Sequence, residues 1–559
     1  MRERGIVIAA AVVAIVVAVV LTAGGGSKHK GSAQPGGKAA AGAVHVSFSY
    51  SPEKQALLEP LVAKFNAERH DAGGHEIYVD AAPASSGDAE DKIAKGKSKP
   101  VVWSPSSSLW GRLLNFDADR HWVAPDNPSI VRTPLVIAMW EPLARALGWP
   151  RRQVSFADVL KLALDKRGWA AYGKPEYGAF KLGHTNPDFS TSGLSAVAAE
   201  YYAATGKREG LTEADVTRPA VRRKIQGIEN SVVHYGDTTL FFADQLKRYG
   251  PAYASAVAME EVTLIDFNRN RSGTKLVGLY PKEGTFFSDD PYLVLDAPWV
   301  TPAQHDAAQT FGKWLTGHVT PQLAAKAGFR PGDPGAKPLA PVDAAHGADP
   351  AEPRRVLSLP EPRVLARLKR AWHADRKPAN VELVVDTSGS MGEENKLDQA
   401  KRGLGVFLRQ LSPRDRVGLV SFNDRFSQLV PVLPFSQGRG RLEAAVRDLF
   451  PDGQTAVYDA TGEGLRTIQS LHDGSRINAV VVLTDGEDNQ SNSTADDLAR
   501  RLEAQSRSEG LTVRVYTIAY GSQANETALK QIADAAGGKE FKGDPTQIES
   551  VYRSISSFF

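Results

Sequence analysis

The sequence predicts an α/β protein that begins with a transmembrane helix, continues into a two-lobed α/β region and ends in an open α/β sheet covered by helices. Three observations predict this class. The chain has 559 residues, which is more than one hydrophobic core usually organises. Residues 5–23 are uncharged and mostly apolar. From residue 44 onward, β-like runs alternate with helical patterns, as in parallel βαβ units.

The composition excludes several classes of function. Lys and Arg total 67 against 64 Asp and Glu, and the resulting net charge of +3 supplies no strong basic field for nucleic acid. The chain has no cysteine, which excludes disulfides, thiolate metal sites, cysteine nucleophiles and a lipid-modified cysteine anchor. The sequence also has no HExxH zinc helix and no GxSxG nucleophile elbow, so we expect a protein that is not an enzyme.

The N-terminal segment predicts a membrane attachment. Arg2 and Arg4 precede residues 5–23, which as a helix would span about 28 Å, close to the ~30 Å hydrocarbon core of a bilayer. The alternatives are a retained anchor and a cleaved signal peptide. The run is long for a signal peptide, and Leu21 fits the small-residue cleavage rule poorly. We therefore expect residues 1–27 to form a single-pass anchor, with the folded domains extracellular.

Composition divides the rest of the chain into four segments. Residues 28–42 are rich in Gly, Ala, Ser and Lys and are predicted to be a flexible linker. Residues 43–330 carry enough elements for two α/β lobes. Residues 331–378 combine a Pro-rich connection with a basic helix that should pack on a neighbouring domain and keep charges such as Lys369 solvated. Residues 379–559 form the C-terminal sheet, with fully apolar strands expected at its centre.

Within the two-lobed region, the second lobe is expected to run continuously from about residue 129 to 317. Its predicted strands are IVRTPLVIAMW, GAFKLGH, VTLIDF at residues 262–267, and PYLVLD. The helix SGLSAVAAEYYAATG lies among them. This arrangement predicts two lobes of similar build that follow one another along the chain.

Oxygen-bearing side chains gather at the expected strand ends of the C-terminal domain. Asp386, Ser388 and Ser390 follow the strand VELVVD, Asp485 follows INAVVVLT, and Thr455 opens a helix between them. Such a DxSxS motif alone is a weak signal, but three loops at one sheet edge would bring two carboxylates and three hydroxyls together. An all-oxygen set suits Mg²⁺ or Mn²⁺ and disfavours zinc or copper. If the hydroxyls are the inner ligands, the cation stays electron-poor and seeks a carboxylate from another protein.

This ordered set resembles the metal-ion-dependent adhesion site of von Willebrand factor type A (VWA) domains, over Val381 to about Phe559. The resemblance implies a Rossmann-like domain that binds a protein ligand through the cation and has no catalytic machinery. It also implies that the three hydroxyls are ligands, and that the two carboxylates act directly or through water. The alternative is a domain that keeps the motif as a hydrogen-bonded turn without metal.

The two lobes resemble bacterial extracellular solute-binding proteins of the type 2 periplasmic fold, in VHVSFSYSPE, HTNPDFSTSG and YPKEGTFFSDDPYLVL. Ser190, Thr191 and Ser192 stand where a helix begins, and free backbone N–H groups there can cradle a small polar or anionic solute. The alternative is an ordinary helix cap. Ser49 and Ser106 lie at comparable strand ends and are weaker candidates for solute contact.

The combination resembles bacterial substrate-binding and VWA domain-containing proteins. It predicts a membrane-anchored extracellular binding protein whose VWA domain takes a protein ligand through Mg²⁺, fused to a solute-binding-like recognition module. The alternative is the solute-binding component of an ABC-type import system, in which the VWA domain is a docking adaptor.

Overall fold

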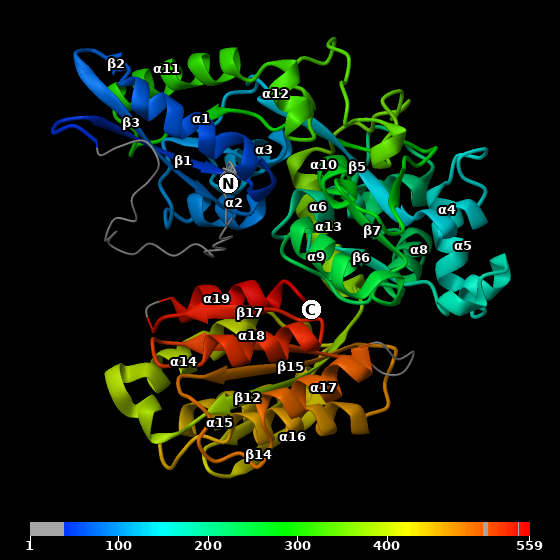
Figure 1. Cartoon of the computed structure of the whole chain (residues 1–559), viewed down its shortest axis with the longest axis vertical. Helices are drawn as coiled ribbons and strands as arrows, with labels where there is room; N and C mark the ends of the chain where they lie inside the picture. Colours follow the sequence, from blue (N-terminus) through cyan, green and yellow to red (C-terminus); the bar gives the residue numbers. More distant parts are fainter. Residues whose placement is uncertain (1–38, 507–511, 546) are drawn as a thin grey trace, which may run out of the picture.

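The computed structural model describes residues 39–506, 512–545 and 547–559, so the anchor predicted at residues 1–27 lies outside the described residues. In the part that is described, no helix is both long and apolar enough to cross a membrane. Figure 1 shows two lobes beside each other and the C-terminal domain packed beneath them. The predicted α/β class is confirmed for all three parts.

The first lobe is built on a five-stranded sheet of order β10-β4-β1-β3-β2. β1 pairs in parallel with β3 and β4, and β10 closes one edge in the antiparallel direction. Helices α1 (Gln55–Glu68) and α11 (Pro302–His318) pack against this sheet. The strands are β1 (Val44–Tyr50), β2 (Asp71–Ala72), β3 (His75–Pro83), β4 (Val102–Ser104) and β10 (Leu293–Val294).

The second lobe is inserted into the first, and the expectation of two consecutive lobes was wrong in this respect. β10 and α11 follow most of the second lobe in the chain but pack in the first lobe, and β11 then returns to the sheet of the second lobe by pairing with β5. Residues 262–267, predicted as a strand, lie in the helix α10 (Glu261–Asn268). Nearly every residue of α10 is buried, so the sequence carries no polar face that would reveal a helical period. The strands are β5 (Val131–Trp140), β6 (Leu182–His184), β7 (Ala256–Glu260), β8 (Leu276–Leu279), β9 (Phe287–Ser288) and β11 (Arg330–Pro331).

The C-terminal domain has a six-stranded sheet of order β14-β13-β12-β15-β16-β17, parallel except for the edge strand β14. All eight residues of β12 and of β15 are buried, as predicted for central strands covered by helices. The strands are β12 (Ala379–Asp386), β13 (Arg416–Phe422), β14 (Phe426–Pro434), β15 (Ile477–Thr484), β16 (Val513–Tyr520) and β17 (Glu540–Gly543). The helices are α14 (Lys396–Gln410), α15 (Phe435–Asp448), α16 (Val457–Ser470), α17 (Ala495–Ser506), α18 (Glu526–Ala535) and α19 (Ile548–Ser556).

Helix α13 (Pro362–Asp375), the predicted basic helix, bridges the two lobes. Lys369 was expected on a solvated face, but its side chain is only 20% exposed and its Nζ lies 3.3 Å from Asp188 of the second lobe. His373 also pairs with Asp188, at 2.6 Å. The same Lys369 ammonium lies 5.7 Å from the ring centre of Trp110 in the first lobe. Separating the lobes would therefore break contacts that α13 makes on both sides.

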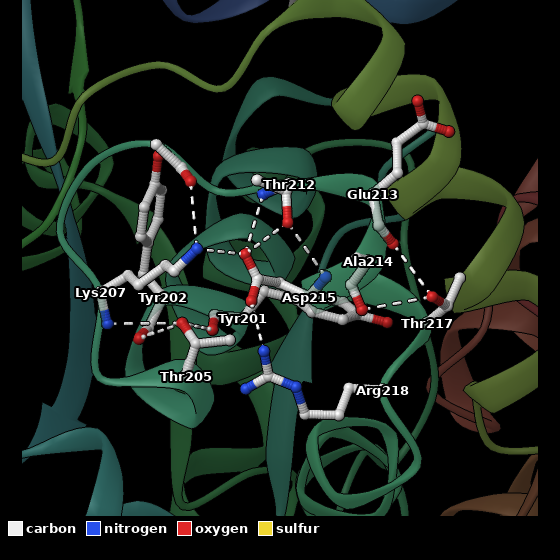
Figure 2. A network of polar contacts seen from close by, with 11 residues as sticks. Tyr201, Tyr202, Thr205, Lys207, Thr212, Glu213, Ala214, Asp215, Thr217 and Arg218 are labelled. Atoms are coloured by element: carbon white, nitrogen blue, oxygen red, sulfur yellow. Dashed lines mark hydrogen bonds and ion pairs between the residues drawn. The ribbon is translucent and has the colours of Figure 1, made fainter.

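Figure 2 shows the polar network that supports one neighbour of α13, the short helix α7 (Glu213–Thr217). The Asp215 carboxylate accepts hydrogen bonds from the backbone N–H and hydroxyl of Thr212 and pairs with Lys207 and Arg218. Burial alone would raise the pKa of Asp215, but the hydrogen bonds from Lys207 and Thr212 lower it to about 2. The start of α7 is thus held by a carboxylate that stays ionised above about pH 2.

Two neighbouring residues join the C-terminal domain to the second lobe. Asp375, at the end of α13, accepts hydrogen bonds from Arg222 of the second lobe at 2.6 and 2.8 Å. Arg376 turns the other way and pairs with Asp415 of the C-terminal domain at 2.7 Å, with both side chains buried. The adjacent, oppositely charged Asp375 and Arg376 therefore connect the end of α13 to the second lobe and to the C-terminal domain.

The base of the C-terminal sheet packs against helix α9 (Thr239–Tyr249) of the second lobe. The Tyr249 hydroxyl donates to the Asp534 carbonyl, and Lys539 pairs with Asp237 just before α9 begins. On the other side, Arg553 of α19 lies 3.7 Å from Asp91 of the first lobe. The C-terminal domain therefore contacts both lobes.

His234 lies buried in this interface and gives it a pH dependence. Its Nδ1–H donates to the Tyr235 carbonyl, so Nε2 is the acceptor for the Tyr253 hydroxyl. Burial, followed by the nearby Arg514 charge, lowers the pKa of His234 to about 3. Between pH 6.5 and 3 the unfolded chain binds a proton at this residue that the folded chain does not, so stability falls as the pH falls.

We expect the contribution of His234 to the free energy of unfolding to drop by about 1.3 kcal/mol between pH 7.0 and 5.5. Urea unfolding of the wild type and of His234→Gln at pH 7.0 and 5.5 measures this difference. The variant should lose less stability on acidification than the wild type. His45→Gln, at a half-exposed histidine, is the control and should keep the wild-type pH dependence. An equal pH dependence in all three proteins would contradict the assignment.

Candidate metal centre and interlobe cleft

The predicted metal ligands lie at the carboxyl edge of the C-terminal sheet. β12 and β15 pair in parallel with Val385 opposite Leu483, so Asp386 and Thr484 end neighbouring strands at one level. Asp485 follows directly. Both carboxylates are fully buried. The central position of these two strands therefore places the two acids side by side, as ligand sites at the carboxyl ends of parallel strands require.

The loop after β12 folds its hydroxyls toward Asp485. The Ser388 backbone N–H donates to Asp386 Oδ1 at 2.7 Å, and the Thr484 hydroxyl donates to Asp386 Oδ2 at 2.5 Å. The Ser388 and Ser390 hydroxyl oxygens are 3.1 Å apart, and Ser390 Oγ donates to Asp485 Oδ1 at 2.8 Å. The structure thus brings four of the five predicted ligands into one hydrogen-bonded chain.

Thr455 completes the set from the loop before α16. A methyl group added at Gly486 would lie 3.5 Å from Thr455 Oγ1 and 3.9 Å from Ser390 Oγ, so the two hydroxyls face the same small space. The Thr455 backbone N–H donates to Asn489 Oδ1 at 3.0 Å, which fixes the loop against the segment after β15. All five predicted residues therefore meet at one place.

The donor set fits a small, hard cation. Adjacent ligands of an octahedral Mg²⁺, each about 2.1 Å from the ion, lie about 3.0 Å apart. The Ser388–Ser390 and Ser390–Asp485 oxygen pairs, at 3.1 and 2.8 Å, already have that spacing. The described part of the chain holds no cluster of three or more His, Asp or Glu side chains placed to bind a metal. A cation here would therefore rely on hydroxyls for much of its coordination.

The electrostatics of the site favour a cation as well. Burial raises the pKa of Asp386 to about 6, against the hydrogen bonds from Thr484 and Ser388, which lower it. A nearby positive charge offsets this cost of burying a carboxylate. The other carboxylate, Asp485, already has such a neighbour in Lys396, whose Nζ lies 2.7 Å from Asp485 Oδ2. Lys396 and Thr484 were not predicted from the sequence as parts of this site. The signal for Thr484 was its place beside Asp485, and Lys396 is the first residue of α14, the helix that follows the loop of Ser388 and Ser390.

A second candidate site lies between the two lobes, where several helices begin. The cavity has a volume of about 20 Å³, which is room for one water molecule and not for an organic solute. An organic solute could enter only if the lobes moved apart. The lining residues are Ser51, Pro52, Glu53, Ser85, Ser86, Ser106, Phe189, Ser190, Thr191, Asp237, Thr238, Thr239, Leu240 and Glu260.

The five residues expected to contact a solute do not all reach this cavity. Ser106, Ser190 and Thr191 line it. Ser192 is buried behind them, with its hydroxyl 3.0 Å from the Ser190 hydroxyl, and Ser49 lies within β1 two residues before the first lining residue. Of the three hydroxyl residues at the start of α6 (Thr191–Thr205), Ser190 and Thr191 therefore line the cavity, and Ser192 lies in the interior of the lobe.

The charges around the cavity oppose an anionic solute. The carboxylates of Glu53, Asp237 and Glu260 line it. Burial, followed by the neighbouring Glu53, raises the pKa of Glu260 to about 7. The nearby Lys54 charge lowers this pKa only in part, and its buried Nζ pairs with Asp290 at 2.9 Å. Since Asp237 already pairs with Lys539, Glu53 and Glu260 are the lining acids that would repel an anionic solute.

Two protein families match the sequence. Residues 380–551 match the von Willebrand factor type A domain. Residues 46–330, slightly more than half of the chain, match the bacterial extracellular solute-binding protein family.

Curated relatives match this chain either over most of its length or over a shorter stretch. An uncharacterized protein of Mycobacterium tuberculosis is 24% identical over 465 residues, which cover 79% of this chain and 64% of the relative. The chain thus spans less than two thirds of that protein. Calcium-activated chloride channel regulator 4 of Homo sapiens is 28% identical over 162 residues, covering 28% of this chain and 16% of the regulator.

Solved structures resemble each part separately. The von Willebrand factor type A structure from Catenulispora acidiphila is 25% identical, with a TM-score of 0.29, and covers 33% of this chain and 43% of that one. A periplasmic thiamin binding protein is 12% identical, with a TM-score of 0.42, and covers 60% of this chain and 99% of that one. Proximal thread matrix protein 1 from the mussel byssus, solved with a zinc-occupied MIDAS motif, is 18% identical, with a TM-score of 0.28, and covers 32% and 47%.

The matched ranges coincide with the two parts that the fold separates, the two-lobed region and the C-terminal sheet with its oxygen-lined edge. The chain therefore belongs to the bacterial extracellular solute-binding protein family through residues 46–330 and joins that region to a von Willebrand factor type A domain at residues 380–551.

Proposed function

We propose that this protein is a binding protein whose VWA domain takes a protein ligand through a divalent cation, Mg²⁺ or Mn²⁺. The observation that carries the proposal is the meeting of two buried carboxylates and three hydroxyls, in which the Ser388–Ser390 and Ser390–Asp485 oxygen pairs already have the spacing of octahedral ligands. The residues that would hold the ion, directly or through water, are Asp386, Ser388, Ser390, Thr455 and Asp485. The cation would supply a coordination position for a carboxylate of the partner.

Residues of the protein itself orient the site for a cation and for a carboxylate of the partner. Thr484 and the Ser388 N–H hold both oxygens of Asp386, which keeps this carboxylate in one orientation. Ser390 Oγ donates its proton to Asp485, which leaves the lone pairs of this oxygen free to face a cation. Ser390 is only partly buried, whereas the Ser388 side chain is covered. The partner's approach is therefore from the Ser390 side.

We further propose that the two-lobed region serves as a recognition module for a polar neutral or cationic solute. The alternative, a component of an ABC-type importer, requires the lobes to open and close freely around their cargo. Helix α13 and the VWA domain contact both lobes, through Lys369 and Arg553 among others. This bridge favours a recognition or sensing role over transport.

We place the folded domains outside the cell and attach them through residues 5–23. The support is the extracellular character of the solute-binding family and the length of that apolar run. Partners would then be proteins or solutes of the cell exterior. The function is binding and not catalysis.

The metal proposal is tested by titrating MgCl₂ into the purified protein in a calorimeter. We expect binding in the millimolar range or tighter, and a loss of affinity of about 100-fold or more in Asp386→Asn, since even residues behind the ligands cost about 10–100-fold. Asp398→Asn on α14, 65% exposed, is the control and should bind as the wild type does. Wild-type protein that takes up no Mg²⁺ at millimolar concentration would end the proposal.

The partner is sought with the same protein. Immobilised protein is exposed to an extracellular fraction with Mg²⁺ or with a chelator, and retained proteins are compared. We expect a partner that is retained only with Mg²⁺ and is lost with Asp386→Asn. If retention of the partner changes neither with the chelator nor with the Asp386→Asn substitution, capture through the cation is excluded.

A further inference from the structure

A buried lysine lies against the metal centre of the VWA domain. Lys396 Nζ donates to Asp485 Oδ2 at 2.7 Å, and the lysine side chain is only 7% exposed. The other oxygen of Asp485 accepts the hydroxyl of Ser390. The Asp485 carboxylate is therefore shared between the ammonium group and the face where the cation would sit.

The fold builds this placement. Glu394 and Asn395 both have left-handed backbone angles, with φ of 51° and 56°, and turn the chain sharply just before α14. Lys396 is the first residue of that helix. Its carbonyl accepts a hydrogen bond at 2.9 Å from the hydroxyl of Tyr520, a buried residue at the end of β16. The position of the lysine is thus fixed from both sides and does not depend on a flexible surface chain.

The lysine changes the charge of the centre. Asp386, Asp485 and Lys396 together carry a net charge of −1 when both acids are ionised. A divalent cation brings this to +1, so the loaded centre attracts one further negative charge. Without the lysine, the same two carboxylates would neutralise the cation completely. Because the site is buried and its effective dielectric constant is low, a single charge matters strongly there.

We propose that Lys396 is a specificity-determining residue of this centre, which weakens its hold on the cation and reserves the bound cation for a carboxylate of the partner. The proposal rests on the proposed function of the metal centre. It predicts two effects of opposite sign when the charge is removed: tighter binding of the metal and weaker binding of the carboxylate. A lysine that only stabilises the fold would produce neither pattern.

The first measurement is calorimetric titration of MgCl₂ into the wild type and Lys396→Met at pH 8. We expect the variant to bind Mg²⁺ about tenfold more tightly or better. Lys396→Gln keeps a donor for Asp485 without the charge and serves if the methionine variant does not fold. Lys401→Met removes a lysine from the same helix that pairs with Asp398 and not with the centre. This control should keep the wild-type affinity.

The second measurement uses acetate as the carboxylate probe on Mn²⁺-loaded protein. Acetate that displaces water from Mn²⁺ lowers the relaxation rate of water protons, and chloride at equal ionic strength corrects for screening. We expect the half-effect concentration of acetate to rise about tenfold in Lys396→Met and Lys396→Gln. The Lys401→Met protein should respond as the wild type does.

The outcomes distinguish a failure of the Lys396 proposal from a failure of the proposed metal site on which it rests. Wild-type protein that binds Mg²⁺, together with Lys396 variants whose metal and acetate affinities both stay within about twofold of it, would make Lys396 a structural ion pair and overturn only this inference. Loss of metal binding in the variants would overturn it as well. Wild-type protein that binds neither Mg²⁺ nor Mn²⁺ would overturn both.

Discussion

Replacing Asp415 with alanine is expected to lower the free energy of unfolding of the VWA domain by about 3–5 kcal/mol, the usual cost of breaking a buried ion pair from one side. Asp415 is fully buried and pairs with Arg376 at 2.7 Å. It also accepts hydrogen bonds from the backbone N–H groups of Ala379 and Ser412, at 2.8 and 2.7 Å. The substitution would leave a buried guanidinium and two backbone donors without this acceptor.

Urea unfolding followed by tryptophan fluorescence and circular dichroism measures the effect. Asp398→Ala, at an exposed aspartate of α14, is the matched control and should change stability by less than about 0.5 kcal/mol. The double variant Arg376→Met with Asp415→Ala should recover part of the loss, because it removes the unpaired cation. If Asp415→Ala were as stable as Asp398→Ala, the Arg376–Asp415 pair would not stabilise the junction between α13 and the C-terminal domain.

The convergence of the five candidate ligands could be predicted from the sequence because three of them are close together in the chain. Asp386, Ser388 and Ser390 stand within five residues, directly after a strand whose apolar run is unmistakable. Asp485 follows a second such strand, and parallel strands bring their carboxyl ends to one edge. The role of Lys396 could not be predicted. A lysine at the start of a helix does not reveal in the sequence that two residues with left-handed backbone angles turn it back toward the site.

Features that depend on distant parts of the chain could not be predicted. Asp188 and Lys369 are 181 positions apart in the sequence, and only the packed lobes reveal that the lysine is covered. The hydroxyls of the interlobe cavity carry the same sequence pattern as helix caps, and the acids that set its charge, Glu53 and Glu260, come from different lobes. The return of β10 to the first sheet is likewise a long-range pairing that no local pattern encodes.

The two lobes approach each other closely at Gly87 in α2 (Ser86–Ala94), and adding a methyl group there should drive them apart. The backbone N–H of Gly87 donates to the Phe189 carbonyl of the second lobe at 2.9 Å. A methyl group on Gly87 would lie 2.1 Å from the Asp188 carbonyl oxygen, which is far inside van der Waals contact. Because that oxygen belongs to backbone, the clash is relieved only by separating α2 from the turn at Asp188.

For Gly87→Ala we expect amide hydrogen exchange in residues 86–94 and 186–192 to speed up by about tenfold or more, equivalent to about 1.4 kcal/mol of lost local stability. Gly317→Ala on α11 is the control, since a methyl group there meets nothing within 4 Å. Exchange should stay unchanged in that variant. If Gly87→Ala also left exchange at 186–192 unchanged, the lobes would not depend on this contact, and α13 with the VWA domain would hold them together alone.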